Sequence, residues 1–215
     1  MTPSHPSAPP PPRSRRADAR RSRASILEAA LRLLNSQPDA SVEAIATAAG
    51  VTRQTVYAHF PSREQLLTVA LDQVTEETVA AMDASDLETG PAADALLRLL
   101  DAGSRTARRY PGLLQMTASL PVSAQADHAR HAPVADRLRR VIERGQQAGE
   151  FDGRFSPDWL VAVTVKLGHA AAEEADAGRM SDEQAAEALH TTLLRALAAP
   201  ARTAPAEATP PRVPG

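Results

Sequence analysis

The chain has 215 residues, of which 43% are hydrophobic and 23% charged, and it contains no cysteine. This length allows one large domain or two smaller ones, and the lack of cysteine excludes disulfide scaffolds, cysteine-ligated metal centres and cysteine nucleophiles. No apolar run reaches the roughly 18 residues needed to cross a bilayer, and the Pro-rich, basic N-terminus lacks the apolar segment of a secretory signal. We therefore expect a soluble, cytoplasmic protein with no membrane partner.

The net charge of −2 is unevenly distributed along the chain. Residues 1–70 contain nine arginines and five acidic residues, a balance of +4, so the remaining residues carry −6. The N-terminal third is basic and the rest of the chain is acidic, which indicates that the two parts have different functions. The near-neutral total therefore does not exclude a nucleic acid as partner.

Helical periodicity runs through nearly all of the chain between two tails. The tails are rich in Pro, Ala, Ser and Thr and bury too little apolar surface to offset chain entropy, so we expect residues 1–20 to be a disordered basic arm and residues 200–215 a disordered tail. The core between them is predicted to be all-α, with residues 121–132 as a loop. The expected helices are, approximately, 21–35, 42–49, 53–60, 63–84, 92–109, 112–120, 134–148, 157–177 and 182–199.

The boundaries of the short helices follow from local capping chemistry. Ser41 and Thr52 are of the type that caps a helix N-terminus. Gly50 suits the left-handed position that ends a helix. Ser62 with Gln65 has the spacing of a capping box for the long helix that follows.

The two short helices, joined by a tight turn, predict a helix-turn-helix. On the second of them, the outward-facing residues are Thr52, Arg53, Gln54, Thr55, Tyr57, Ala58 and His59. This face carries hydrogen-bonding groups and a cation but no acid, which suits a polyanion. Amphipathic helix pairs are common in other proteins, but a merely solvated face usually mixes charges, so the DNA-binding interpretation is favoured.

Four sequence blocks resemble a known family. Ile-Leu-Glu-Ala-Ala at 26–30, Val-Glu-Ala-Ile-Ala at 42–46, and the blocks at 49–57 and 59–67 look like the DNA-binding domain of TetR-family transcriptional regulators. The resemblance spans about residues 21–70 without gaps. It implies a three-helix helix-turn-helix domain, residues 21–68, linked by a long helix to an all-helical ligand-binding and dimerisation domain, residues 69–199.

The same resemblance implies a function. A homodimer would bind a palindromic operator in double-stranded DNA, most often as a repressor and less often as an activator, and a small-molecule effector, unknown from the sequence, would release it. The alternative is an all-α enzyme or ligand-binding protein with an incidental helix pair. No nucleophile–base pair, phosphate-binding loop or dinucleotide motif appears in the sequence, which weakens that alternative.

Roles of individual residues on the second short helix follow from the family's pattern. Those expected at phosphates are Thr52, Tyr57 and His59, and those expected nearest base edges are Arg53, Gln54 and Thr55. Their chemistry agrees with these roles. A Gln can bind adenine through two hydrogen bonds, an Arg can bind guanine or hold a phosphate, and the Thr methyl can contact thymine.

Further DNA contacts are expected around this helix. Ser41 belongs to the predicted interface, and Arg63 stands where the family usually has Lys, near the DNA backbone. In the basic arm we expect DNA contact by Arg20, Arg21 and Arg23, either along phosphates or in the minor groove. The alternative for the arm is a solvated tail.

The last two helices carry stripes of small and apolar residues that resemble the family's four-helix dimer seam, although a core face within one subunit has the same pattern. The residues expected at the dimer interface are Leu160, Thr164, Leu167, Gly168, Ala171, Leu189, Leu193 and Ala196. An effector pocket is expected among the helices between 92 and 177, with ordinary core packing as the alternative for each candidate. The candidates are Tyr110, Met116, Trp159 and His169.

No metal ion and no cofactor are expected. His128 and His131 lie near Asp127 in the expected loop, but loop histidines seldom form a metal site without further ligands. His169 and Glu173, at i and i+4, more often form a surface pair on a helix.

Overall fold

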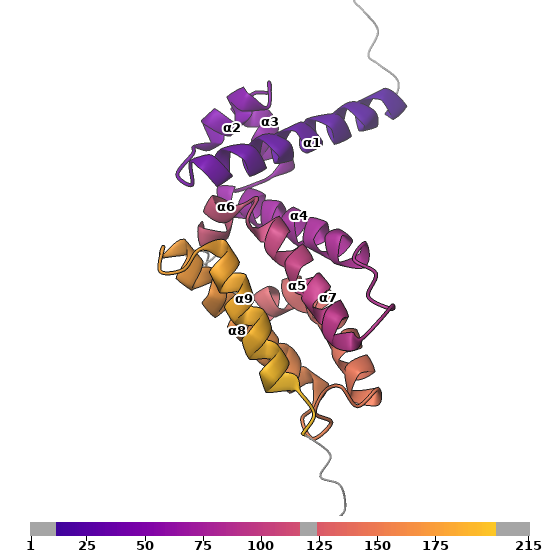
Figure 1. Ribbon diagram of the computed structural model, residues 1–215. Helices are drawn as coiled ribbons and strands as arrows, with labels where there is room; N and C mark the ends of the chain where they lie inside the picture. The colour runs from indigo at the N-terminus through magenta and orange to yellow at the C-terminus, as the bar shows by residue number, and fades with distance from the viewer. Residues whose placement is uncertain (1–11, 117–123, 201–215) are drawn as a thin grey trace, which may run out of the picture. The chain divides into compact units, whose positions relative to one another are not determined.

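The computed structural model describes residues 12–116 and 124–200 (Figure 1). Within these ranges it contains helices and no β-strand, apart from one isolated bridge between Phe151 and Ala198, so the predicted all-α class is confirmed. The helices are α1 (Pro12–Ser36), α2 (Val42–Ala48), α3 (Arg53–His59), α4 (Arg63–Asp83), α5 (Ala92–Ala107), α6 (Pro111–Gln115), α7 (Ala124–Gln147), α8 (Pro157–Asp176) and α9 (Asp182–Leu197). In the described part of the chain, none of them combines the length and apolarity that a membrane span requires. Most of the expected N-terminal arm and C-terminal tail, residues 1–11 and 201–215, lies outside the described residues.

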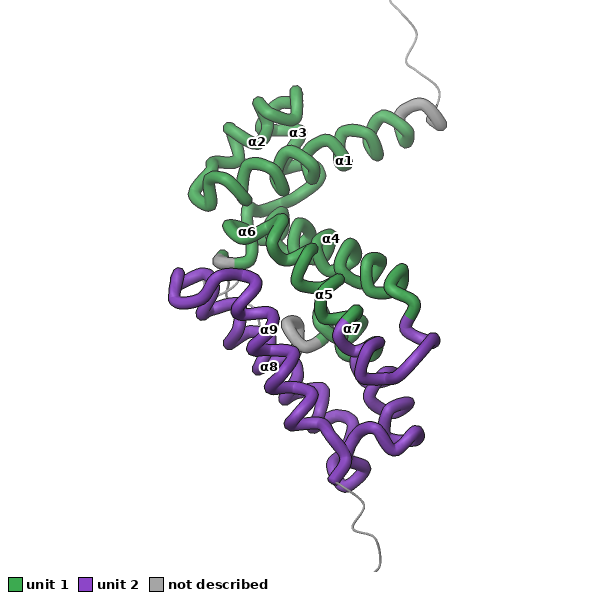
Figure 2. The backbone as a smooth tube through the Cα atoms, in the orientation of Figure 1, with its two compact units in different colours: residues 1–86, 98–137 green, residues 87–97, 138–215 purple. Residues whose placement is uncertain are grey.

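The chain forms two compact units (Figure 2). The first contains residues 1–86 and 98–137, and the second contains residues 87–97 and 138–215. Within the first unit, the first turns of α4 share a core with α1, and the expected domain boundary near residue 69 stays a prediction. Ile26 and Leu34 of α1 belong to the same buried cluster as Leu66 of α4.

The core of the first unit surrounds the short helices. Buried residues of α1 recur at i, i+3, i+4 and i+8, which gives the helix one apolar stripe. That stripe packs with the buried faces of α2 and α3, with α4 and with one leucine of α6. The most buried members from the short helices and their flanks are Ile45, Ala46, Val56, Phe60 and Leu113.

The predicted helix caps are confirmed. Ser41 Oγ accepts a hydrogen bond from the Ala44 amide at 3.1 Å, and Thr52 Oγ1 accepts one from the Thr55 amide at 3.1 Å. Ser62 caps α4 in the same way by accepting from the Gln65 amide, but the Gln65 side chain does not return a hydrogen bond, so only half of the predicted capping box is formed. Each cap satisfies an amide that has no partner within its helix.

Two helix starts were predicted wrongly. α1 begins at Pro12 rather than near Arg21, because Pro is favourable in the first helical turn and the Arg- and Ala-rich residues 13–36 contain no further Gly or Pro. α7 begins at Ala124, so residues 124–132 are helical rather than a loop. Pro133 lies inside α7, where the prediction had placed a boundary. α6 ends at Gln115 rather than near residue 120, and residues 117–123 lie outside the described residues.

The second unit is held by contacts between segments distant in sequence. α8 and α9 pack against each other, and α9 starts with a complete capping box formed by Ser181 and Gln184. The Glu150 carboxylate accepts hydrogen bonds from the Ala92 and Ala93 amides at 2.9 and 3.0 Å, which fixes the start of α5. These contacts join α5, the end of α7 and the α8–α9 pair.

Candidate nucleic-acid interface

The turn between α2 and α3 is fixed by its backbone. Gly50 has a φ of +67°, a left-handed conformation that other residues rarely adopt. Its amide donates to the Thr47 carbonyl at 3.1 Å, and the Val51 amide donates to the Ala46 carbonyl at 3.0 Å. With Val56 and Phe60 buried beneath it, α3 has one defined outward face.

That outward face presents the residues expected at DNA. Arg53, Gln54, Tyr57 and Ala58 are exposed, whereas Thr55 and His59 are half-buried. No acidic residue lies within α3. The face is therefore available to a polyanion without charge repulsion.

Arg53 and Tyr57 form a pair one helical turn apart. The Arg53 guanidinium lies 5.5 Å from the centre of the Tyr57 ring, and its Nη2 donates to the Tyr57 hydroxyl at 3.5 Å. This hydrogen bond raises the pKa of Arg53 above its usual value. The two side chains thus restrain each other in the chain without DNA, which lowers the conformational entropy that either must lose on binding.

Thr52 and Thr55 also lie together. Their hydroxyl oxygens are 2.8 Å apart, and the Thr52 oxygen additionally caps the helix. Thr52 therefore has a structural role as N-cap besides the phosphate contact expected of it. The half-buried position of Thr55 leaves only part of its side chain available to a base.

Arg63, expected at the DNA backbone, has a partner within the chain. Its Nη2 donates to the Pro38 carbonyl at 2.7 Å, which ties the start of α4 to the loop before α2. The side chain is half-buried. Arg63 therefore holds the short helices in place, whatever contact its remaining N–H groups make.

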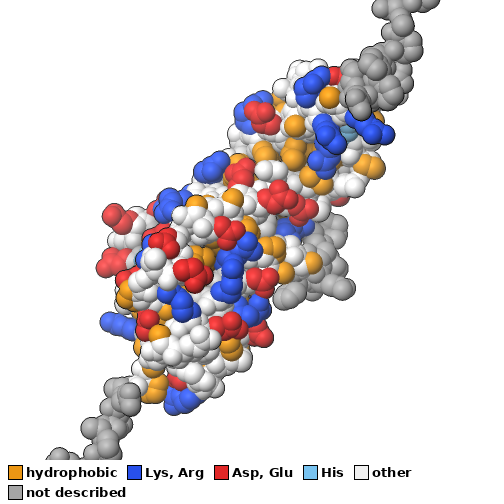
Figure 3. All heavy atoms as spheres, turned by 90° about the vertical axis from the view of Figure 1, so that its right-hand side faces the viewer, with side chains coloured by type: hydrophobic (Ala, Val, Ile, Leu, Met, Phe, Trp, Pro, Cys, Tyr) orange, Lys and Arg blue, Asp and Glu red, His pale blue; other side chains and the backbone are white. Residues whose placement is uncertain are grey.

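The three arginines expected to contact DNA from the arm lie on α1 as helical residues. Arg20 is exposed. Arg21 forms an ion pair with Asp18, and the Arg23 guanidinium lies 5.0 Å from the centre of the Phe60 ring. Figure 3 shows several basic side chains and a histidine close together on the upper part of the face drawn.

Comparisons with known proteins agree with this geometry. Residues 26–70 match the family described as bacterial regulatory proteins, tetR family. The HTH-type transcriptional repressor LfrR of Mycolicibacterium smegmatis is 30% identical over 173 residues, covering 80% of this chain and 88% of that repressor. This chain belongs to the TetR family. It is accordingly a transcriptional regulator and not an enzyme.

One further TetR-type regulator and a solved structure of LfrR also match most of the chain. The HTH-type transcriptional regulator TcmR of Streptomyces glaucescens is 27% identical over 195 residues, covering 80% of this chain and 81% of that regulator. A crystal structure of LfrR from Mycobacterium smegmatis in complex with proflavine has a TM-score of 0.61 at 28% identity, covering 82% of this chain and 96% of that chain. TetR-family regulators bind DNA and ligands and act as dimers.

The residues expected at the dimer interface divide into two groups. Leu160, Thr164, Leu189 and Leu193 are between 0% and 7% exposed in the single chain. Their own subunit covers most of each side chain, and their place at a dimer interface stays a prediction. Leu167, Gly168 and Ala171 are half-buried and Ala196 is exposed, so these four remain candidates for the interface.

The residues expected at the effector pocket also lie in different environments. Met116 packs on the core of the first unit. Trp159 is 58% exposed at the start of α8, and His169 is also exposed. Exposure of the Trp159 ring does not fit a residue that encloses a ligand within one chain. A surface ring of this size suits contact with another molecule instead.

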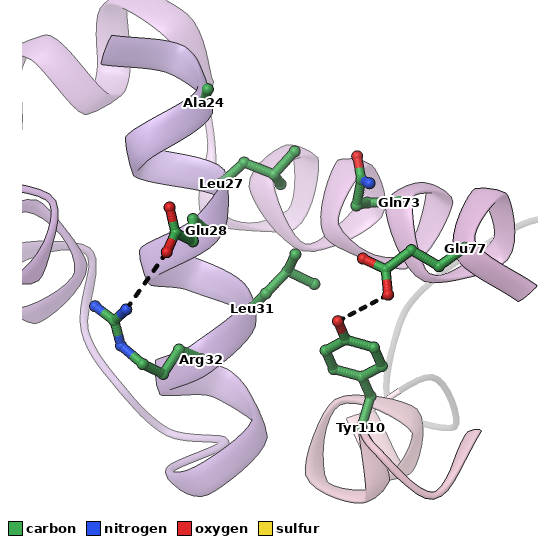
Figure 4. A pocket seen from close by; sticks show the side chains of 8 residues that line it. All are labelled: Ala24, Leu27, Glu28, Leu31, Arg32, Gln73, Glu77 and Tyr110. Carbon is green, nitrogen blue, oxygen red and sulfur yellow. Dashed lines mark hydrogen bonds and ion pairs between the residues drawn. The ribbon is translucent and has the colours of Figure 1, made fainter. Parts of the chain in front are cut away.

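Tyr110 lines a pocket of about 450 Å³ within the first unit (Figure 4). Its walls are mainly α1 and α4, and an effector pocket among the helices between 92 and 177 stays a prediction. Leu27 and Leu31 of α1 point toward Glu77 of α4, and the Tyr110 hydroxyl donates to Glu77 at 3.0 Å. Partial burial, followed by this hydrogen bond, raises the pKa of the Tyr110 phenol.

A contact that the sequence does not predict joins the end of α1 to the segment between α5 and α6. Asn35 Nδ2 donates to the Arg109 carbonyl at 2.8 Å, and the Gly112 amide donates to Asn35 Oδ1 at 3.1 Å. The end of α1 is thereby fixed to the segment between α5 and α6. No local pattern could have indicated this pairing, because its partners are more than 70 residues apart.

Among the residues whose side chains the structure describes, no three histidines or acidic residues are grouped as metal ligands. His131 and His169 each have a polar or ring contact. The side chains of Asp127 and His128 lie outside the described residues.

Proposed function

We propose that this TetR-family regulator is a homodimeric repressor that binds a palindromic operator through α3 and is released by a small-molecule effector. The observation that carries the proposal is the exposed, acid-free face of α3, fixed by the Thr52 cap and the Gly50 turn. The assignment of repression follows LfrR, a repressor that is 30% identical to this chain.

On this proposal the residues of α3 have separate roles. Gln54, exposed and unrestrained by its neighbours in α3, reads adenine through its amide. Arg53, restrained on the Tyr57 ring, reads guanine or holds a phosphate beside it. Tyr57, His59 and Thr52 donate to phosphates and fix the register of the helix without reading sequence.

The proposed dimer places two copies of α3 about 34–36 Å apart, facing successive major grooves. Its seam uses the part of α8 and α9 that the single chain leaves uncovered. Leu167, Gly168, Ala171 and Ala196 are the candidates that satisfy this condition. The small side chains among them permit close approach of helices.

The proposed effector binds next to helices that are coupled to the DNA-reading face. LfrR has been solved with proflavine, a flat aromatic cation. The pocket beside Tyr110 offers two leucines and the phenol ring of Tyr110 to a flat aromatic ligand, while its carboxylates, Glu28 and Glu77, already lie 3.9 and 3.3 Å from the Arg32 and Arg109 guanidiniums. To release DNA, effector binding needs a coupling free energy on the order of 1–3 kcal/mol.

The test begins with selection of duplexes from a random-sequence library by the full chain. A palindromic consensus is expected, bound by a dimer in sedimentation and weakened by proflavine or a related cation. Gln54→Ala should alter preference at particular bases, whereas Tyr57→Phe should weaken all duplexes alike. The exposed Gln147, at the end of α7, supplies the matched control for the loss of a glutamine, Gln147→Ala. No enrichment of any sequence would refute operator binding, and a uniform effect of Gln54→Ala would refute its base-reading role.

A further inference from the structure

The N-terminal half of α1 carries an arginine ridge, which we define as Arg16, Arg20 and Arg23. At 100° per residue the positions i, i+4 and i+7 fall within about 60° of one another on the helix surface. All three side chains are exposed. Within the described part of the chain, no carboxylate pairs with any of them. The ridge is therefore a line of unneutralised positive charge.

The acid on this segment lies on the other side of the helix. Asp18 is displaced from Arg16 by about 160° around the axis, and Arg21, also on that side, pairs with Asp18. The pair cancels its own charge away from the ridge. Arg21 pairs with Asp18, whereas the neighbouring Arg20 has no carboxylate partner among the described residues. Arg21 is therefore a matched control for Arg20.

The ridge starts beside the DNA-reading helix. The Arg23 guanidinium stacks on the ring of Phe60, the residue that follows the last residue of α3. From there the ridge runs along α1 toward its N-terminus for roughly 10 Å. Figure 1 shows this half of α1 extending beyond α2 and α3.

Before Arg23 reaches Phe60, the described side chains of this part of α1 lie in solvent. Residues 16–21 are all exposed, and the only apolar side chains between residues 16 and 25 are alanines. A helix with no apolar face is not suited to insertion into a lipid surface or to a protein groove. Its one distinctive chemical feature is the positive charge of the ridge.

We propose that the arginine ridge binds the phosphate backbone of DNA flanking the operator, as a preformed helix lying along the duplex. A helix with its side chains is about 10–12 Å wide, whereas the minor groove of B-DNA is about 6 Å wide. The segment therefore does not enter the minor groove as an extended arm does. This inference rests on the proposed DNA-binding function and adds to it a contact outside the operator.

The energetic contribution of the ridge is electrostatic and independent of sequence. Each neutralised phosphate adds about 0.9 to the slope of log affinity against log salt concentration. Three arginines per protomer therefore add between two and three to that slope. Because the helix is already formed, little ordering entropy opposes the contact.

The experiment compares Arg20→Gln with Arg21→Gln on two duplexes that share the selected operator, one ending at its edge and one with about one helical turn of mixed sequence on each side. Affinity and its salt dependence are measured for each. Arg20→Gln should weaken binding to the flanked duplex about three-fold per protomer and reduce its salt slope by about 0.9 per protomer, or about two for the dimer, with little effect on the short duplex. Arg21→Gln should change either duplex less than two-fold, and Arg16→Gln with Arg20→Gln should roughly double the effect of Arg20→Gln alone.

Modified flanks identify the docking mode. Neutral methylphosphonates in the flanks should remove the difference between wild type and Arg20→Gln, whereas exchanging flanking A·T for G·C pairs should not. Equal effects of Arg20→Gln and Arg21→Gln, or dependence on flanking base pairs, would overturn the proposal while leaving operator binding intact. Tighter binding of the full chain to anionic vesicles than to the flanked duplex would also overturn the proposal. Failure of wild type to bind either duplex would instead refute the proposed function itself.

Discussion

Substituting Asn35 with Ala tests the joint between α1 and the segment linking α5 to α6. The change removes both hydrogen bonds of the side chain amide, to the Arg109 carbonyl at 2.8 Å and from the Gly112 amide at 3.1 Å. Each neutral hydrogen bond contributes about 0.5–1.5 kcal/mol, so the free energy of unfolding should fall by about 2 kcal/mol. For a chain of this size that corresponds to a decrease in Tm of roughly 4–8 °C.

The assay is urea unfolding followed by circular dichroism, with Ser36→Ala as the matched control. Ser36 is the next residue, is exposed, and its hydroxyl donates only to carbonyls one turn back in α1, at 3.2 Å. Ser36→Ala should lower the free energy of unfolding by less than about 0.5 kcal/mol. Equal losses for the two variants would refute the conclusion that Asn35 joins distant segments of the first unit.

Three further predictions concern stability. Gly50→Ala should lower the free energy of unfolding by about 1 kcal/mol in urea, because φ is +67° and no neighbouring atom would contact the new Cβ; an unchanged midpoint would contradict the strained turn. Gly145→Ala should lower the free energy of unfolding by about 1–3 kcal/mol, because the added Cβ would overlap the buried Phe151 ring. A loss no larger than that of a substitution at an exposed position would contradict this packing. Arg154 lowers the pKa of the Asp152 carboxyl, so the stabilisation from this pair is complete above the unfolded pKa of about 4 and is lost as the pH falls through the folded value. Arg154→Gln should therefore flatten the acid-side decline in stability relative to wild type, and parallel curves for the two proteins would contradict the pairing.

Local chemistry made much of the DNA-reading region predictable from the sequence. The caps at Ser41, Thr52 and Ser62 and the turn at Gly50 depend on residues no more than three positions away. The outward face of α3 follows from the same short-range pattern, because Val56 and Phe60 define the opposite, buried side.

Prediction failed where proline was taken as a boundary or where distant segments decide the outcome. Pro12 starts a helix and Pro133 lies within one, so residues beside them were assigned to a tail and a loop. The stripe containing Leu160 and Leu193 has the same pattern whether it faces its own subunit or a partner, and that both residues are buried in the single chain follows only from the packing of α8 on α9. No local sequence pattern around Asn35 predicts its hydrogen bonds with Arg109 and Gly112.

The most direct test of the central claim is the affinity of Arg53→Ala and Gln54→Ala, separately and together, for the selected operator and for a mixed-sequence duplex of equal length at fixed salt. If α3 reads the operator, the combined variant should lose most of the preference for the operator, by about 1–3 kcal/mol for each base contact removed. Its affinity for the mixed-sequence duplex should fall far less. An operator preference that survives both substitutions would show that DNA is read elsewhere on the molecule.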